Sequence, residues 1–235
     1  MGPCFFYLIQ WREMTISVEN LYSAYLDLLE EENKRQNLIR YKTRDELIQK
    51  HLRDSLIPFE EGLIEPLTGQ IIDIGSGGGF PSIPLAIMYK TVSFTLIESE
   101  KRKAQFLNKV IQSLDLKNTT VVNERVEVYA KENRNEYDYC TMRAVAATGI
   151  CLEYTAPLLK VGGKLLLYKG PSFKDELEAS RNAIKALGMD FKKSIRYDYT
   201  FNGEHFNPVL TIFQKVEETP KQYPRRPGMA KKRPL

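Results

Sequence analysis

The sequence predicts an α/β fold in which a doubly wound, mostly parallel sheet follows a helical N-terminal extension. Residues 71–74 form a β-branched apolar run, typical of a buried parallel strand, and lead directly into a glycine-rich loop. Pro81 follows at a position suited to the first turn of a helix. Near the end of the chain, two predicted strands flank the turn signal Asn202-Gly203. Strand, glycine loop and helix together are typical of a nucleotide-binding turn.

The glycine loop has glycine at every second position from Gly75 to Gly79, which lets the backbone approach a ligand closely. The dinucleotide fingerprint Gly-x-Gly-x-x-Gly is incomplete, because Phe80 occupies its last position. The pattern from Asp73 to Gly79 is instead similar to the first motif of class I S-adenosylmethionine-dependent methyltransferases. The next predicted strand ends at Glu98, whose carboxylate can accept both ribose hydroxyls of an adenosine.

Apolar runs and amphipathic segments alternate along the rest of the chain, as an α/β fold requires. Further strands are predicted at residues 94–97, 119–122, 137–142, 163–168, 191–201 and 209–216. Helices are predicted at residues 99–114, 149–159 and 175–187.

Two helices are predicted ahead of the glycine loop. Ser17 is a candidate cap for a helix that reaches about residue 34. Thr43 and Glu46 have the spacing of a capping box for a second helix, which Pro58 is expected to end. His51 lies on the apolar stripe of that helix, so we interpret it as a hydrogen-bonded, half-buried histidine rather than a catalytic one.

The chain divides into four predicted parts. The apolar run at residues 4–9 lacks the flanks of a signal peptide and is too short to span a membrane, whereas Met14 opens a more ordinary N-terminus. The parts are a non-native or disordered extension (1–14), an N-terminal helical extension (15–66), a methyltransferase domain (67–217) and a basic C-terminal tail (218–235).

Composition narrows the classes of function. The three cysteines show no Cys-x-x-Cys spacing and the chain has only two histidines, which argues against a metal site and fits a reducing cytoplasm. The net charge is +4, and the six basic residues from Lys221 onward occur without any acid, so the tail carries the whole positive excess. Cys140 falls within a predicted strand and is interpreted as a core residue rather than a nucleophile.

Candidate site residues follow the ends of the predicted strands, where ligands of open parallel sheets bind. After the third strand, Val126 can pack on an adenine and Glu127 can address its polar edge, although a plain surface loop is equally compatible with the spacing. Arg143 ends the fourth strand, and its fixed donors suit a carboxylate, a phosphate or a guanine edge; a purely structural ion pair is the alternative. Lys169 ends the fifth strand.

The tail is a cationic strip for which nucleic-acid phosphate is the favoured ligand over bulk solvent. Its four prolines, from Pro220 to Pro234, argue against a helix. The candidate RNA contacts, together with Lys169, are Arg225, Arg226, Lys231, Lys232 and Arg233.

From about residue 17 to its end, the chain resembles the RsmG (GidB) family of bacterial methyltransferases of small-subunit ribosomal RNA. Ser82 stands where the family usually has glycine, a mild departure. The resemblance rests on His51-Leu52-Arg53-Asp54-Ser55, the run from Asp73 to Pro84, Glu98 to Arg102, Arg125-Val126-Glu127, Arg143 to Ala146, and Tyr223 to Gly228.

The resemblance implies a class I core, with a seven-stranded, mostly parallel sheet closed by an antiparallel hairpin. It implies methyl transfer from S-adenosylmethionine to guanine N7 in the decoding-region loop of 16S rRNA, as free RNA or in an assembly intermediate of the small subunit. It also implies cofactor contacts at Gly75, Phe80, Val126, Glu127 and Arg143. The glycine-loop interpretation adds Ser76, Gly77 and Glu98 to the cofactor-binding set.

The predicted chemistry needs no general base, because guanine N7 carries a free lone pair and the enzyme has only to align the reacting atoms. Arg143 is therefore expected to orient the substrate or the carboxylate of the cofactor. The alternatives are a methyltransferase acting on another RNA or a small molecule, a nicotinamide-dependent oxidoreductase, and a non-catalytic RNA-binding module.

Overall fold

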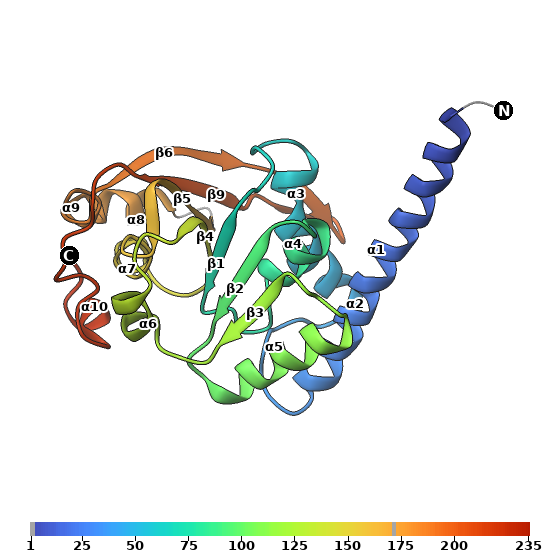
Figure 1. The fold of residues 1–235 in the computed structure, drawn as a ribbon, viewed down its shortest axis with the longest axis horizontal. Coiled ribbons are helices and arrows are strands. Elements are labelled where there is room, and N and C mark those ends of the chain that lie inside the picture. The colour runs from blue at the N-terminus through green and yellow to red at the C-terminus, as the bar shows by residue number, and fades with distance from the viewer. Residues whose placement is uncertain (1–2, 171–172) are drawn as a thin grey trace.

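A single seven-stranded sheet organises the computed structural model, which describes residues 3–170 and 173–235 (Figure 1). Its strand order is β3-β2-β1-β4-β5-β9-β6. The first five strands run parallel, whereas β9 pairs antiparallel with both β5 and β6, so the predicted class I arrangement with its antiparallel closure is confirmed. The strands of the sheet are β1 (Gln70–Ile74), β2 (Ser93–Ile97), β3 (Thr119–Val122), β4 (Tyr137–Arg143), β5 (Leu159–Lys169), β6 (Met189–Arg196) and β9 (Val209–Lys215).

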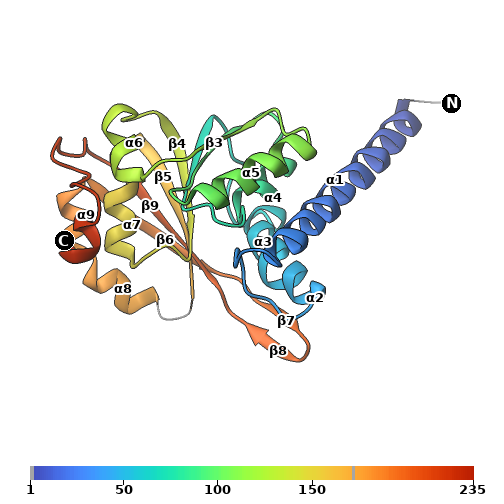
Figure 2. The same cartoon turned by 90° about the horizontal axis from the view of Figure 1, so that it is seen from below.

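Helices cover both faces of the sheet and give the protein two apolar cores (Figure 2). Successive side chains of a strand point to opposite faces, so Leu166 and Tyr168 of β5 enter one core while Leu165 and Leu167 enter the other. The first core lies under α1 (Pro3–Asn33), α3 (Asp54–Glu60), α4 (Ser82–Met88) and α5 (Lys101–Ser113). The second lies under α6 (Val126–Glu132), α7 (Thr148–Thr155), α8 (Phe173–Ala179) and α9 (Arg181–Ala186).

The N-terminal helix differs from its prediction. Helix α1 begins at Pro3, so Ser17 lies inside the helix and its prediction as a cap is wrong. No glycine or proline interrupts the chain between Pro3 and Asn33, and proline is well tolerated at a helix start. Whether residues 1–14 are an upstream extension stays a prediction.

The second helical segment is divided into α2 (Arg44–Leu47), the π-helix η1 (Ile48–Arg53) and α3. The predicted Thr43 cap is confirmed, since its side chain accepts a hydrogen bond from Glu46 N at 3.2 Å. The predicted stop at Pro58 is wrong, because α3 continues to Glu60. Proline has no N–H for the Asp54 carbonyl, and the Tyr197 hydroxyl donates to that oxygen at 3.2 Å instead.

Two further segments near the C-terminus are also more finely divided than predicted. The helix expected over 175–187 breaks at Ser180, whose hydroxyl donates to Glu176 O at 2.6 Å. A small hairpin, β7 (Tyr199–Phe201) and β8 (Glu204–Phe206), projects from the body around Asn202-Gly203 (Figure 2). Both turn residues have positive φ, 50° and 77°, as predicted for this turn.

The tail contains one helical turn, α10 (Met229–Lys232), so the expectation that it would be free of helix is wrong. The turn fits between Pro227 and Pro234, neither of which lies inside it. Across the described ranges, none of the helices combines the length and the apolar character that a membrane crossing requires.

Candidate cofactor and acceptor site

The glycine loop lies at the carboxyl end of β1 and presents bare backbone to the space beyond the sheet. Gly75 N donates to Ile97 O at 2.8 Å, which fastens the loop to the neighbouring strand. Gly75 has φ +74°, and a Cβ added there would lie 3.0 Å from Val145 Cγ2. Gly79 has φ +101°, and its Cβ would lie 2.7 Å from Ile83 Cγ1. Side chains at these two positions would both strain the backbone and fill the space, which explains the glycine requirement.

Glu98, predicted to bind a ribose, holds the glycine loop from the end of β2. Its two oxygens accept hydrogen bonds from Gly77 N at 3.0 Å and from Glu100 N at 2.8 Å. Each carboxylate oxygen accepts more than one hydrogen bond, so both retain capacity for a hydroxyl. The predicted ribose contact stays a prediction.

Asp73, the first residue of the glycine-loop motif, is buried beneath the loop. Thr141 Oγ1 donates to its Oδ1 at 2.7 Å, whereas its Oδ2 has no hydrogen-bond partner among the described residues. Burial raises the pKa of this carboxyl to about 7. A buried polar oxygen without a partner next to exposed backbone is a feature of binding sites for polar ligands.

A cavity of about 100 Å³ opens beside the glycine loop, at the carboxyl ends of β1 to β4. We call it the cofactor cavity. It brings together Gly75, Val126 and Glu127, which the sequence predicted as cofactor contacts. Its lining residues are Ile74, Gly75, Ile97, Ser99, Glu124, Arg125, Val126, Glu127, Val145, Tyr154 and Lys231.

Glu127 lines the cofactor cavity but its carboxylate already has partners. Arg125 donates to it twice, at 3.1 and 2.6 Å, and Gly228 N of the tail donates at 3.0 Å. Burial favours the neutral acid, but the hydrogen bonds from Arg125 and Gly228 outweigh it and lower the pKa of Glu127. The group is therefore an ionised anchor for the tail as well as a wall of the cavity.

A second cavity of about 380 Å³, the acceptor cavity, opens at the ends of β4 and β5. Val145 lines both cavities, so the two are neighbours. The lining residues are Asp54, Arg143, Ala144, Val145, Ala146, Leu167, Tyr168, Lys169, Gly170, Glu176, Tyr197 and Pro208. A group transfer requires a cofactor space and an acceptor space close to each other.

Arg143 lies at the acceptor cavity, and its guanidinium is directed at the N-terminal extension. It donates to Lys50 O at 2.7 Å and to His51 Nδ1 at 2.9 Å, and it pairs with Asp54 at 3.3 Å. The pair with Asp54 is the structural ion pair that the sequence analysis gave as the alternative role of Arg143. Contact with cofactor or substrate stays a prediction for this residue.

His51 has both ring nitrogens engaged, as expected for a half-buried histidine. Nδ1 accepts from Arg143, so the proton is assigned to Nε2, which lies 3.2 Å from Arg40 O. Burial and the neighbouring guanidinium lower the pKa of His51 to about 4. Phe80, also predicted to bind the cofactor, packs between the His51 ring and Tyr25, with centroid distances of 5.7 and 5.3 Å.

Lys169 at the end of β5 pairs with a carboxylate inside the acceptor cavity. Its Nζ lies 2.6 Å from Glu176 Oε2 and 2.9 Å from Ala146 O. Thr148 donates to the same oxygen through both its N–H and its hydroxyl. Although burial opposes the charge, these donors lower the pKa of Glu176, which stays ionised. Within the described contacts, Oε1 is the oxygen left for a ligand.

The predicted RNA contacts of the tail fall into three environments. Arg225 is directed inward, since its N–H and Nε donate to the buried Glu153 at 3.0 and 2.9 Å. Lys231 lines the cofactor cavity. Arg226, Lys232 and Arg233 are exposed on the surface. The RNA contact predicted at Arg225 stays a prediction, and the structure gives this residue an internal partner.

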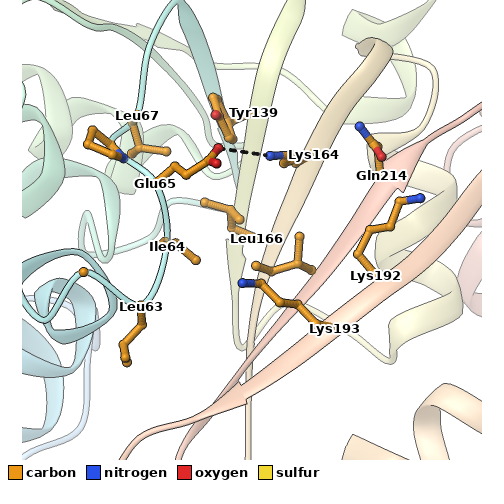
Figure 3. A pocket seen from close by; sticks show the side chains of 13 residues that line it. Leu63, Ile64, Glu65, Leu67, Tyr139, Lys164, Leu166, Lys192, Lys193 and Gln214 are labelled. Carbon is orange, nitrogen blue, oxygen red and sulfur yellow. Dashed lines mark ion pairs between the residues drawn. The ribbon is translucent and has the colours of Figure 1, made fainter.

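A third cavity, larger than these two, lies away from this edge. It has a volume of about 730 Å³ and we call it the lysine groove (Figure 3). Its walls are the loop at residues 62–67, which precedes β1, and residues within β4, β5, β6 and β9. Two of its lysines have acidic partners, Lys164 with Glu65 at 3.7 Å and Lys192 with Asp190 at 2.7 Å.

Sequence reasoning missed several residues of the site. Asp54 and Glu176 enter the acceptor cavity from helices, and Tyr154 enters the cofactor cavity from α7. Asp54 belongs to the motif from His51 to Ser55, which supports the family resemblance, so the sequence did contain a signal for it. Glu176 and Tyr154 lie on helices outside such a motif, and no local pattern marks them as site residues. No group of histidine, cysteine and acidic side chains suited to a metal ion occurs in the described parts of the chain.

Comparison with known proteins agrees with the geometry. The family model for GidB, rRNA small subunit methyltransferase G, matches residues 18–197. Two relatives named ribosomal RNA small subunit methyltransferase G are each 39% identical. The one from Carboxydothermus hydrogenoformans covers 95% of this chain and 96% of its own, and the one from Thermotoga neapolitana covers 86% of each.

Solved structures agree at the level of the fold. M. jannaschii TYW2, solved in complex with AdoMet, matches with a TM-score of 0.55 at 17% identity, over 76% of this chain and 79% of its own. A precorrin-6y C5,15-methyltransferase from Geobacter metallireducens matches with a TM-score of 0.52 at 17% identity, over 76% and 90%. With its family model and its relatives in agreement over most of its length, the chain belongs to the rRNA small subunit methyltransferase G (GidB) family.

Proposed function

We propose that this protein transfers the methyl group of S-adenosylmethionine to N7 of a guanine in the decoding-region loop of small-subunit rRNA. The names of its relatives support an rRNA substrate. The observation that carries the proposal is that the cofactor and acceptor cavities are neighbours that share Val145 in their walls. The partner is small-subunit rRNA, free or in an assembly intermediate, and the location is the cytoplasm.

The residues at the carboxyl edge fit the proposed cofactor. The bare backbone from Gly75 to Gly77 lets an adenosine approach the loop closely, and Glu98 can accept from the ribose hydroxyls. Val126 is placed to pack on the base. The Oδ2 of Asp73, which has no hydrogen-bond partner among the described residues, adds a polar group beneath the loop. When bound, S-adenosylmethionine supplies an electrophilic methyl group.

The acceptor cavity suits a guanine. The Lys169 ammonium can donate to O6, and the ionised Glu176 can accept from the N–H groups of the same edge. Such contacts leave N7 free to face Val145 and the cofactor cavity. Because N7 attacks with its own lone pair, the chain supplies position and charge rather than a base. Glu176 then places a carboxylate near the purine as it becomes cationic.

Arg143 and Asp54 contribute indirectly to this arrangement. Their ion pair joins the end of β4 to the N-terminal extension and so holds one wall of the acceptor cavity in place. The exposed Arg226, Lys232 and Arg233 are the tail residues available for RNA phosphates. A lost phosphate contact in single-stranded RNA lowers the slope of log affinity against log salt by about 0.7.

The test is to map 7-methylguanine in small-subunit rRNA from a strain lacking the gene, with and without complementation. The proposal predicts loss of one methylated guanine in the decoding region and its return with the wild-type gene. An unchanged methylation pattern would contradict it. Purified protein assayed on naked rRNA and on small subunits then separates the two forms of substrate.

A further inference from the structure

Tyr154 is a cofactor-cavity residue to which no role has yet been assigned. It lies near the end of α7 and is 3% exposed, and its hydroxyl has no hydrogen-bond partner among the described residues. It lines the cofactor cavity and lies close to Glu127. Buried hydroxyls are nearly always paired, so an unpaired one in a ligand cavity points to a polar group of the ligand.

The C-terminal tail forms another wall of the same cavity, and two internal contacts fix it there. Arg225 holds the buried Glu153 through its backbone and its side chain. Gly228 N donates to Glu127 at 3.0 Å. Between these contacts and the chain end, Ala230 is 2% exposed and Lys231 lines the cavity.

We propose that Tyr154 and Lys231 complete the adenine end of the cofactor site, the Tyr154 hydroxyl bonding to the 6-position edge of the purine and Lys231 covering the ring. The inference rests on the proposed function, since it takes the cavity to hold the adenosine of S-adenosylmethionine. It makes the basic tail part of the cofactor site as well as a surface for RNA.

The neutral hydroxyl of Tyr154 and the hydrogen bonds already made by Glu127 support this assignment. Burial, with the Glu127 carboxylate nearby, raises the pKa of Tyr154 to about 12, so the hydroxyl is neutral and can both donate and accept. Glu127, the residue first expected to address the purine edge, already accepts three hydrogen bonds from Arg125 and Gly228. The tyrosine is therefore the uncommitted polar group of the two.

Lys231 differs from its neighbour Lys232 in a way that supports the role. Both lie in α10, but only Lys231 lines the cofactor cavity among the tail residues. A lysine stem can cover an apolar ring while its ammonium stays in water. The adjacent lysine is thus a matched control on the same helical turn.

The experiment measures binding of S-adenosylhomocysteine to the full chain by calorimetry, without RNA. Tyr154→Phe should weaken binding roughly fivefold to tenfold, the effect of one neutral hydrogen bond. Tyr129→Phe is the control, because that hydroxyl bonds to Tyr137 at 2.6 Å outside the cavity, and it should change the affinity less than twofold. An unchanged affinity in Tyr154→Phe, or an equal loss in Tyr129→Phe, would overturn the proposal.

A second ligand tests the purine edge directly. The analogue of S-adenosylhomocysteine with hydrogen in place of the 6-amino group offers no hydrogen bond at that position, so wild-type protein should prefer S-adenosylhomocysteine, and Tyr154→Phe should reduce that preference. An unreduced preference would overturn the contact to the 6-position. Lys231→Ala should weaken binding of S-adenosylhomocysteine twofold to fivefold and Lys232→Ala should not; equal affinities would overturn the role of Lys231. If wild-type protein bound neither ligand, the proposed function itself would fail.

Discussion

The carboxyl edge of the sheet and the lysine groove differ in size and in chemistry. The groove holds about 730 Å³, against about 100 and 380 Å³ for the cofactor and acceptor cavities. Yet the edge contains the strained glycine backbone, the unpartnered oxygens of Asp73 and Tyr154, and an ionised glutamate. In this protein, unsatisfied polar groups and open backbone indicate the site better than volume does.

Strand direction explains the difference. In a parallel sheet the loops that follow the strands gather at one edge, so residues far apart in sequence meet there. The groove is lined instead by residues within the strands β4, β5, β6 and β9 and by the loop before β1, and two of its lysines already have acidic partners. Its walls offer a large space without a converging set of free groups.

The strongest test of this comparison is to replace one glycine by alanine at the carboxyl edge and another in the lysine groove. Gly75→Ala and Gly62→Ala both place a Cβ at positive φ, +74° and +65°, so their backbone strain is similar, about 1–2 kcal/mol. Only Gly75 abuts Val145; at Gly62, in the groove, a Cβ meets nothing within 4 Å. Gly75→Ala should reduce methyl transfer by more than 100-fold, and Gly62→Ala should leave it within about threefold. Equal losses in a methylation assay would contradict the account.

A second comparison concerns the tail. Arg225→Ala leaves the buried Glu153 without its guanidinium partner, and we expect it to lower the free energy of unfolding by about 3 kcal/mol. Arg226→Ala removes an exposed side chain and should change it by less than about 0.5 kcal/mol. Urea denaturation measures both. The roles assigned to the two arginines would be wrong if Arg226→Ala proved the more destabilising.

The raised pKa of Asp73 predicts a pH dependence. The folded protein keeps this carboxyl protonated up to about pH 7, whereas the unfolded chain ionises it near 3.8. Its contribution to stability is thus fully present below pH 3.8 and is lost as the pH rises towards 7, by up to about 1.4 kcal/mol per unit. Relative to Asp73→Asn, wild-type protein should lose stability from pH 4.5 to 7. Parallel denaturation curves across that range would contradict the prediction.

The smallest expected effect is in the groove. The double variant Lys192→Ala, Lys193→Ala removes two of its cations without touching the carboxyl edge. Methyl transfer to small-subunit rRNA should stay within about twofold, as for most surface substitutions. A loss of fivefold or more, measured together with the salt dependence of RNA binding, would identify the groove as a second RNA surface.

Sequence predicted the fold well where signals are local. The strand-loop-helix at residues 71–81, the Thr43 cap and the Asn202-Gly203 turn depend on neighbouring residues, and all three are present. Pro58 failed as a stop because its compensation comes from Tyr197, far along the chain. A local pattern carries no information about such a distant donor.

The site was predictable to the same extent. Gly75, Val126 and Glu127 follow strands, so topology alone brings them to one cavity. Arg225 appeared to be a free cation because its partner, Glu153, lies 72 positions away. Tyr154 and Glu176 lie on helices whose packing decides which side chain meets the cavity, and composition does not reveal that.

The most direct test is a crystal structure of the protein with S-adenosylhomocysteine. The account predicts the ligand at the carboxyl edge, with its ribose at Glu98 and its purine between Val126 and the Tyr154 hydroxyl, and the lysine groove free of it. A ligand bound in the lysine groove, or one whose purine lies away from Tyr154 and the glycine loop, would contradict the account.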